Sequence, residues 1–142
     1  VQKDGDIYRF VPSVAPLKEK YRISDRYGYR THPISGERQF HAGLDMAAVY
    51  AATVHAAASG TVTFAGETPG YGKTVVVTHR FGFQTRYAHL TLIYTRKGAK
   101  VEKGDVIGFV GSTGISTGNH LHYEVIKNQK RINPLNFIYG TK

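Results

Sequence analysis

The sequence of 142 residues contains no cysteine. A disulfide framework and a thiol nucleophile are therefore excluded, and with them disulfide-stabilised scaffolds and cysteine hydrolases. No hydrophobic run approaches the roughly 18 residues that a membrane-spanning helix needs. The most alanine-rich part, residues 46–58, is interrupted by Thr53 and His55. We therefore expect no membrane insertion by this chain.

Acidic residues are also scarce. Ten aspartates and glutamates face nineteen lysines and arginines, which gives a formal net charge of +9 at pH 7. This balance predicts attraction to a polyanion, such as nucleic acid, an anionic membrane or an acidic cell-wall polymer. The basic residues are scattered in runs of no more than two, so we expect no dedicated nucleic-acid arm.

The sequence begins at Val1 and shows no secretory signal, which we interpret as a processed protein or a fragment of a larger one. Its length suits a single domain with a core of its own. A hydrophobic content of 41% and sixteen glycines are typical of a globular, turn-rich protein.

Short β-branched segments separated by glycine dominate the sequence from residue 54 onward. Residues 80–82 are expected to close a hairpin, and no eleven-residue window shows convincing helical periodicity. We predict a mostly β domain, an antiparallel sheet with a groove walled by loops, one wall being residues 27–40, and few or no long helices. The predicted strands are Val54–Ala58, Thr61–Ala65, Lys73–His79, Phe83–Tyr87, Val106–Val110 and Leu121–Ile126.

The first 24 residues differ in character from the rest. They contain one candidate strand, Ile7–Val11, followed by a linker bracketed by Pro12 and Pro16. We predict that this N-terminal segment lies outside the core and that the domain covers residues 25–142.

Two histidine patterns supply ligands of the kind that hold a catalytic metal. His120 and His122 are two apart on a predicted strand, so both project from one face. His41 and Asp45 are four apart, which places them on one side of either a helix or a strand. Two imidazoles and a carboxylate form a three-ligand zinc site with a fourth position free for water. If the segment is extended, Gly43 leaves room for the metal.

Spacing alone leaves both a metal site and coincidence open, because the chain has seven histidines. The surroundings add an ordered series of motifs. They are Asp25-Arg26-Tyr27-Gly28-Tyr29-Arg30, His32-Pro33, His41-x-Gly43-x-Asp45, Ala58-Ser59-Gly60-x-Val62, Gly70-Tyr71-Gly72, Thr85-Arg86-Tyr87-Ala88-His89-Leu90, Val101-x-Lys103-Gly104, Ile107-Gly108, Gly111-Ser112-Thr113-Gly114 and Thr117-Gly118-Asn119-His120-Leu121-His122-Tyr123-Glu124.

Together these motifs resemble the lysostaphin/LytM-type zinc endopeptidases of bacterial cell walls. The resemblance covers about four-fifths of the chain, from residue 25 to residue 138. It implies that the zinc ligands are His41, Asp45 and His122. It also implies that His89 and His120 are two histidines that do not bind the metal but flank its water.

Family members that act as regulators without enzymatic activity typically lack some of these five residues, whereas this chain keeps all of them. The resemblance therefore implies catalytic competence. The departures from the family pattern are small: residues 51–53 replace a glycine-containing turn, and Asn119 stands where proline is common. Neither touches an expected ligand.

The expected function is zinc-dependent hydrolysis of the peptide stems or cross-bridges of bacterial peptidoglycan, in the cell envelope, either periplasmic or extracellular. His89 and His120 would share the general-base and oxyanion-stabilising work, and the sequence does not divide it between them. Residues 26–45 resemble versions from Gram-negative envelopes, which favours direct cross-links over glycine bridges. A regulatory segment upstream that blocks the groove is a further expectation.

Two alternatives remain open at this stage. The same scaffold serves non-catalytic peptidoglycan-binding or regulatory domains. Residues 101–108 also resemble the turn signature of lipoyl- and biotinyl-carrier domains, although no lysine stands in the usual context for modification.

The other candidate residues receive more modest interpretations. His55 and His79 lie in predicted strands and are expected to be structural, and His32 is expected in a loop beside the groove. Glu124 shares the face of His122, and we expect it to support the site rather than act as general base. Tyr71 either lines the substrate cleft or is an ordinary turn tyrosine.

Overall fold

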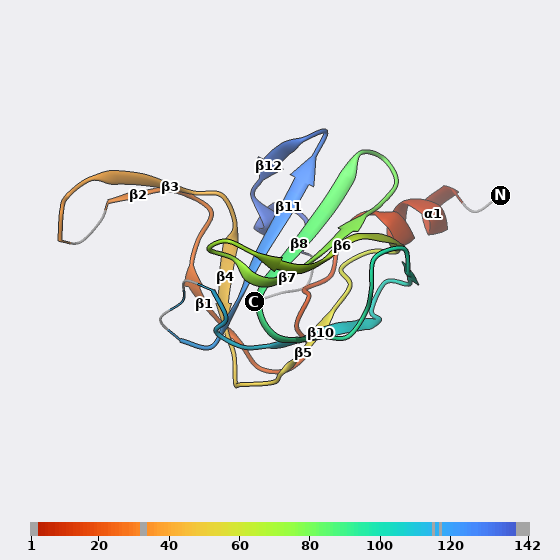
Figure 1. Ribbon diagram of the computed structural model, residues 1–142. Helices are drawn as coiled ribbons and strands as arrows, with labels where there is room; N and C mark the ends of the chain where they lie inside the picture. The colour runs from red at the N-terminus through yellow and green to blue at the C-terminus, as the bar shows by residue number, and fades with distance from the viewer. Residues whose placement is uncertain (1–2, 32–33, 115, 117, 139–142) are drawn as a thin grey trace.

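The computed structural model describes residues 3–31, 34–114, 116 and 118–138. One large antiparallel sheet dominates it (Figure 1), which confirms the predicted mostly β fold. Among the described residues no helix is long and apolar enough to cross a bilayer. The elements in chain order are α1 (Lys3–Phe10), β1 (Arg22–Asp25), β2 (Gly28–Thr31), β3 (Arg38–His41), β4 (Leu44–Ala47), β5 (Thr53–His55), β6 (Gly60–Thr68), β7 (Gly72–Thr78), β8 (Phe83–Ile93), β9 (Lys100–Val101), β10 (Val106–Val110), β11 (His120–Lys127), β12 (Lys130–Ile132) and the 3₁₀ turn η1 (Pro134–Asn136).

The main sheet runs in the order β1-β4-β11-β8-β7-β6-β9, with β10 pairing with β5 and β8, and β12 pairing with β11. β2 and β3 form a separate hairpin that projects from the body of the molecule (Figure 1). Residues 27–40, predicted to form a wall of the groove, make up most of this hairpin, and their role as a wall stays a prediction.

The central strands carry core residues on one face and candidate site residues on the other. On β11, Leu121, Tyr123 and Val125 are fully buried in the hydrophobic core. The residues between them, His120, His122 and Glu124, belong to the opposite face, because side chains alternate along a strand. The paired strand β4 follows the same rule, with Leu44 and Met46 in the core and Asp45 on the other side.

The six strands predicted from residue 54 onward are present, most of them with different boundaries, and the one predicted over Val54–Ala58 is reduced to β5, Thr53–His55. β10 matches its prediction, whereas β8 continues from Tyr87 to Ile93. Four consecutive residues of β8, from Tyr87 to Leu90, are buried, so the alternating pattern disappears there. Pairing with β11 ends at Ala88, and pairing with β10 begins at Leu90.

The turn between β7 and β8 forms where it was predicted. Phe83 N donates to Arg80 O at 3.3 Å, and the two central residues have positive φ, 63° at Phe81 and 80° at Gly82. Positive φ at both central positions defines the type I′ turn, whose twist matches that of a two-stranded antiparallel ribbon. The predicted hairpin is confirmed.

The N-terminal segment departs from its prediction in two respects. Residues 3–10 form the helix α1 instead of a strand over Ile7–Val11, and Val11 N donates to Ile7 O at 3.0 Å. Ile7, Phe10 and Val11 have the i, i+3, i+4 spacing of one helical face, which the strand prediction overlooked.

The prediction that this segment stays outside the core is also wrong. Leu17 is buried and bridges to Val54, and the Pro16 carbonyl accepts a hydrogen bond of 2.7 Å from His55 N. The segment thereby covers the edge that β5 exposes. The domain boundary between residues 24 and 25 stays a prediction.

Candidate metal centre

Three predicted ligands converge where the end of the β2–β3 hairpin meets strands β4 and β11 of the main sheet. His41 is the last residue of β3, Asp45 lies on β4, and His122 lies on β11. Each offers a donor atom within 4.8 Å of the other two. Asp45 and His122 are direct partners across the β4–β11 ladder, so strand register alone brings them together.

His41 and Asp45 do not share one helix or strand, as the sequence interpretation assumed. β3 ends at His41, the chain turns through Ala42 and Gly43, and β4 begins at Leu44. His41 Nε2 nevertheless lies 3.4 Å from Asp45 Oδ2. The turn therefore brings His41 and Asp45 together, where a single helix or strand was expected to do so.

Gly43 makes this turn compatible with the neighbouring strand. A Cβ atom there would lie 2.7 Å from His122 Cε1, 2.8 Å from Tyr123 O and 2.9 Å from Glu124 Cγ. Atoms of real side chains do not approach so closely. The missing side chain thus leaves room for the imidazole of His122, where the sequence suggested room for the metal itself.

Hydrogen bonds orient both ligand imidazoles. His41 Nδ1 lies 3.0 Å from Arg26 O, and because a carbonyl only accepts, this nitrogen carries the proton. Nε2 of His41 is left to face Asp45. On His122 the arrangement is reversed: Nε2 lies 2.9 Å from Glu124 Oε2, and Nδ1 lies 2.7 Å from Asp45 Oδ1.

Two further histidines stand beside this cluster. The ring centroids of His89 and His120 are 4.8 Å apart, and that of His89 is 6.1 Å from that of His122. His89 Nδ1 donates to Thr113 O at 2.6 Å, and His120 Nδ1 to Gly118 O at 3.0 Å. In their neutral forms both rings therefore keep a lone pair on Nε2, and Nε2 of His120 lies 3.9 Å from Asp45 Oδ2.

His89 occupies an unusual backbone conformation. Its φ is 63°, a left-handed value that costs a non-glycine residue free energy. The backbone holds it there on both sides: His89 N donates to Tyr71 O at 2.9 Å, and Gly111 N donates to His89 O at 3.1 Å. Strain maintained by surrounding hydrogen bonds is a recurrent property of functional sites.

The charges of the cluster are strongly coupled. Burial raises the pKa of Asp45, but hydrogen bonds and charge from His122 and His41 outweigh it and hold this pKa below its usual range. Burial lowers the pKa of His122, yet Asp45 and Glu124 together raise it to about 9. Two carboxylates on opposite sides of one imidazole thus create a place that favours a positive charge.

The pKa of His89 is shifted in the other direction. Burial lowers it, the neighbouring imidazoles of His120 and His122 add to this, and the hydrogen bond to Thr113 O opposes it. The ring is therefore disposed to be neutral near pH 7, the state in which Nε2 can accept a proton.

Sequence reasoning did not foresee the network around Glu124. Its carboxylate accepts hydrogen bonds from Tyr71 Oη at 2.9 Å, Arg86 Nη1 at 3.3 Å and Arg131 Nε at 2.9 Å, besides that of His122. Burial raises the pKa of Glu124, and the hydrogen bonds from His122 and Arg131 bring it down to about 2. The pairing of Arg86 with Glu124 across the β8–β11 ladder is the one signal that a correct strand alignment would have offered.

Of the three remaining histidines, two make hydrogen bonds within the fold and one lies outside the described residues. His55 bonds with Gly104 O and Thr53 Oγ1, and His79 with Ser59 O and Thr85 Oγ1, all at 2.8–2.9 Å. Both are buried, as expected for structural residues. His32 lies outside the described residues.

The model of peptidase family M23 matches residues 39–134, and the chain belongs to this family. Residues 39–134 contain all three residues of the cluster together with His89 and His120.

Two curated relatives resemble most of this chain but are much longer. The DD-carboxypeptidase/endopeptidase Mpg of Neisseria meningitidis serogroup B is 48% identical over 120 residues, which are 84% of this chain and 28% of the relative. The peptidoglycan DD-endopeptidase ShyA of Vibrio cholerae serotype O1 is 36% identical over 134 residues, 94% of this chain and 31% of the relative. The chain thus spans about a third or less of these proteins.

Solved structures share the fold. A zinc-containing peptidase from Vibrio cholerae superposes with a TM-score of 0.79 at 32% identity, over 89% of this chain and 39% of that one. The catalytic domain of lysostaphin from Staphylococcus simulans gives 0.74 at 30% identity, over 82% and 91%. The SpoIIQ–SpoIIIAH pore-forming complex gives 0.79 at 28% identity, over 92% of each chain.

Proposed function

We propose that this chain is a zinc-dependent endopeptidase that hydrolyses peptide cross-links of bacterial peptidoglycan. The observation that carries the proposal is the convergence of His41, Asp45 and His122 beside two histidines with available Nε2 atoms. Two imidazoles and one carboxylate suit zinc and leave a coordination position open. When bound there, zinc supplies Lewis-acid polarisation of a carbonyl group and acidifies water.

The chain's own residues contribute the proton transfers. Nδ1 of His89 and of His120 is engaged with a backbone carbonyl, so Nε2 of each ring is the atom that accepts or delivers a proton. The lowered pKa of His89 suits a general base at neutral pH. We assign the complementary role to His120 with a proton on Nε2, close to Asp45: its Nε2–H donates a hydrogen bond to the negative charge that develops on the reacting carbonyl oxygen.

Tyr71 is proposed to border the bound peptide. Its hydroxyl is committed to Glu124 and its ring lies 5.5 Å from that of His122, so the contact it offers to substrate is the partly exposed ring. The wall substrate places the chain in the cell envelope, either in the periplasm or outside the cell.

The relatives named as DD-endopeptidases support a direct peptide cross-link as the substrate. We expect the purified, zinc-loaded chain to convert cross-linked muropeptide dimers into monomers, identified by mass. Removing zinc with a chelator should abolish the conversion, and adding zinc should restore it. Failure of a folded, zinc-loaded protein to release any product from purified peptidoglycan would refute the proposal.

A matched pair of substitutions tests the assigned roles. His89→Ala is expected to reduce turnover by about 10²–10⁴-fold, the range for loss of a general base, while zinc stays bound. His122→Ala is expected to abolish zinc binding as well. Loss of zinc from the His89→Ala protein would contradict the role given to His89.

A second candidate function is a non-catalytic interaction domain. The likeness to the SpoIIQ–SpoIIIAH pore-forming complex favours it, since it extends over most of this chain. A zinc-loaded protein that binds peptidoglycan without cleaving it would support this alternative.

A further inference from the structure

We propose that Glu124 is a positioning residue of the metal centre: its carboxylate holds the Nε2–H of His122 and thereby presents Nδ1 of that ring to the metal. This inference rests on the proposed zinc site. It assigns the nitrogen of His122 that binds the metal and the group that selects it.

Glu124 is buried to an unusual degree for a carboxylate. Its side chain is 1% exposed, whereas those of the arginines that contact it are 26% exposed at Arg86 and 44% exposed at Arg131. A buried carboxylate is costly unless charge and hydrogen bonds compensate it. The two guanidinium groups provide the charge, and both bind the same oxygen, Oε1.

The second oxygen has different partners. Oε2 accepts one hydrogen bond from Tyr71 Oη and one from His122 Nε2, each at 2.9 Å. The carboxylate therefore has four donors for about four lone-pair sites. No site is left to take a proton from substrate, which argues against Glu124 as general base.

This saturation fixes the protonated nitrogen of His122. An ionised carboxylate only accepts, so the nitrogen that faces Oε2 must carry hydrogen. In the neutral ring the lone pair then resides on Nδ1, which lies 2.7 Å from Asp45 Oδ1 and within the cluster. A carboxylate behind a ligand histidine sets both its tautomer and its ring orientation.

Close packing also keeps the imidazole of His122 in this orientation. A Cβ atom on Gly43 would lie within 3 Å of both the His122 ring and Glu124 Cγ, so the turn before β4 packs directly against this pair. Glu124 and His122 are also two apart on the same strand face, which keeps them adjacent.

The experiment compares wild-type protein with Glu124→Gln and with Glu102→Gln, a carboxylate whose side chain is 71% exposed. Glutamine preserves the shape, but its NH₂ group must face either the arginines or the His122 and Tyr71 donors. We expect Glu124→Gln to weaken zinc binding by about 10–100-fold, measured by competition with a chelator. Glu102→Gln should leave it unchanged. Thermal unfolding of the zinc-free proteins separates loss of positioning from loss of folding.

A second measurement keeps the inference testable if Glu124→Gln does not fold. Long-range ¹H–¹⁵N correlation spectra of the wild-type protein, recorded with zinc bound or without zinc well above pH 9 so that the ring is neutral, report which nitrogen of His122 carries hydrogen. The signals are assigned by their loss in His122→Gln. Hydrogen on Nε2 supports the inference. Hydrogen on Nδ1 alone, or a folded Glu124→Gln protein with zinc affinity within twofold of wild type, would overturn it.

The outcomes also distinguish this inference from the proposed function. A wild-type protein that binds no zinc refutes the proposed function. The tautomer of His122 in that zinc-free protein, measured well above pH 9 where the ring is neutral, still decides whether Glu124 positions it. Wild-type zinc binding and cleavage with no effect of Glu124→Gln refutes the role of Glu124 alone.

Discussion

At the scale of single residues, Gly43 shows how a missing side chain builds a site. The three atoms that a Cβ would strike belong to consecutive residues of β11, among them the His122 ring. We expect Gly43→Ala to displace that ring and to weaken zinc binding by at least about tenfold, as disturbance of groups that orient a ligand does. Chelator competition measures the change. Gly66→Ala is the control, because a Cβ there would make only an ordinary contact at 3.5 Å with Phe64.

His79 offers a pH-dependent test of stability that is remote from the cluster. Burial lowers its pKa to about 4, a hydrogen bond to Ser59 O opposes the shift, and the charge of Lys103 adds to it. In the unfolded chain the pKa is about 6.5, so between these values the unfolded state binds the extra proton. The contribution of His79 to the free energy of unfolding is therefore complete above about pH 6.5 and is lost as the pH falls towards 4.

The shift in the pKa of His79 sets the size of this contribution to the free energy of unfolding, which is at most about 3 kcal/mol. Urea unfolding of wild-type protein and His79→Gln across this pH range measures it. We expect the free energy of unfolding to fall less steeply with acidification in the variant. Parallel curves for the two proteins would show that His79 is not the titrating group.

At the scale of elements, one side chain from the loop after β9 makes several of the contacts that hold the N-terminal segment. Lys103 Nζ donates to Tyr8 O, to Val11 O at 3.1 Å and to Ser13 Oγ at 2.6 Å, and lies 3.6 Å from the centre of the Tyr8 ring. Burial lowers the pKa of this amine to about 8. The ammonium group also suits the C-terminal end of α1, where carbonyl groups lack helical partners.

We expect Lys103→Met to loosen α1 and the segment up to Leu17 while the sheet stays folded. Amide hydrogen exchange should become faster in residues 7–17 and remain slow in β7 and β8. The free energy of unfolding should fall by about 1.5–3 kcal/mol, the range for hydrogen bonds to a charged group. The exposed Lys97 provides the control variant Lys97→Met. Equal exchange rates in both variants would contradict the anchoring role.

Element boundaries show where local patterns stop being informative. Strand β10 was predicted correctly because glycines delimit it on both sides. The extension of β8 to Ile93 was missed, because burial on both faces erases the alternation that marks a strand. Helix α1 was missed because three apolar residues in so short a segment fit both a strand and a helix.

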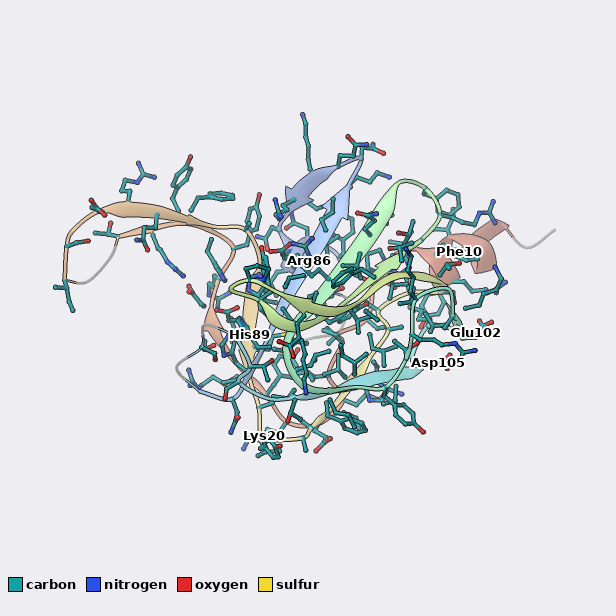
Figure 2. All side chains as sticks on the ribbon, viewed as in Figure 1. Phe10, Lys20, Arg86, His89, Glu102 and Asp105 are labelled. Atoms are coloured by element: carbon teal, nitrogen blue, oxygen red, sulfur yellow. The ribbon has the colours of Figure 1, made fainter. Side chains whose placement is uncertain are left out.

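At the scale of the whole molecule, the formal net charge of +9 predicts electrostatic attraction to a carboxylate-rich wall polymer. Part of this charge lies far from the metal centre. Arg9 and Arg80 stack on Phe10, which Figure 2 shows well away from His89 and at the end of the molecule opposite to the β2–β3 hairpin. The attraction to the polymer would then be spread over the protein surface.

We therefore expect co-sedimentation with purified peptidoglycan to weaken steeply as salt is raised from about 0.01 M to 1 M, where the screening length falls from about 30 Å to 3 Å. Zinc affinity, which depends on direct contacts, should change much less over the same range. If binding to peptidoglycan does not change with salt concentration, shape and hydrogen bonds contribute more to it than charge does.

The sequence by itself determined the chemical types at the site and the strands that carry most of them. His120 and His122 share a face because strand periodicity is a local property, and that prediction holds. The order of the motifs also identified the family. Local spacing gave the wrong element for His41 and Asp45, since a turn, not a helix or strand, joins them.

Only the tertiary structure decided which groups surround these side chains. Asp45 meets His122 across 77 positions of sequence, and Glu124 meets Arg86 across 38, through the registers of β4, β11 and β8. Strand register depends on how whole faces are buried, and a slip of one residue would turn every side chain to the other face. The carboxylate behind His122 and the carbonyl groups that orient the other rings are consequences of that register.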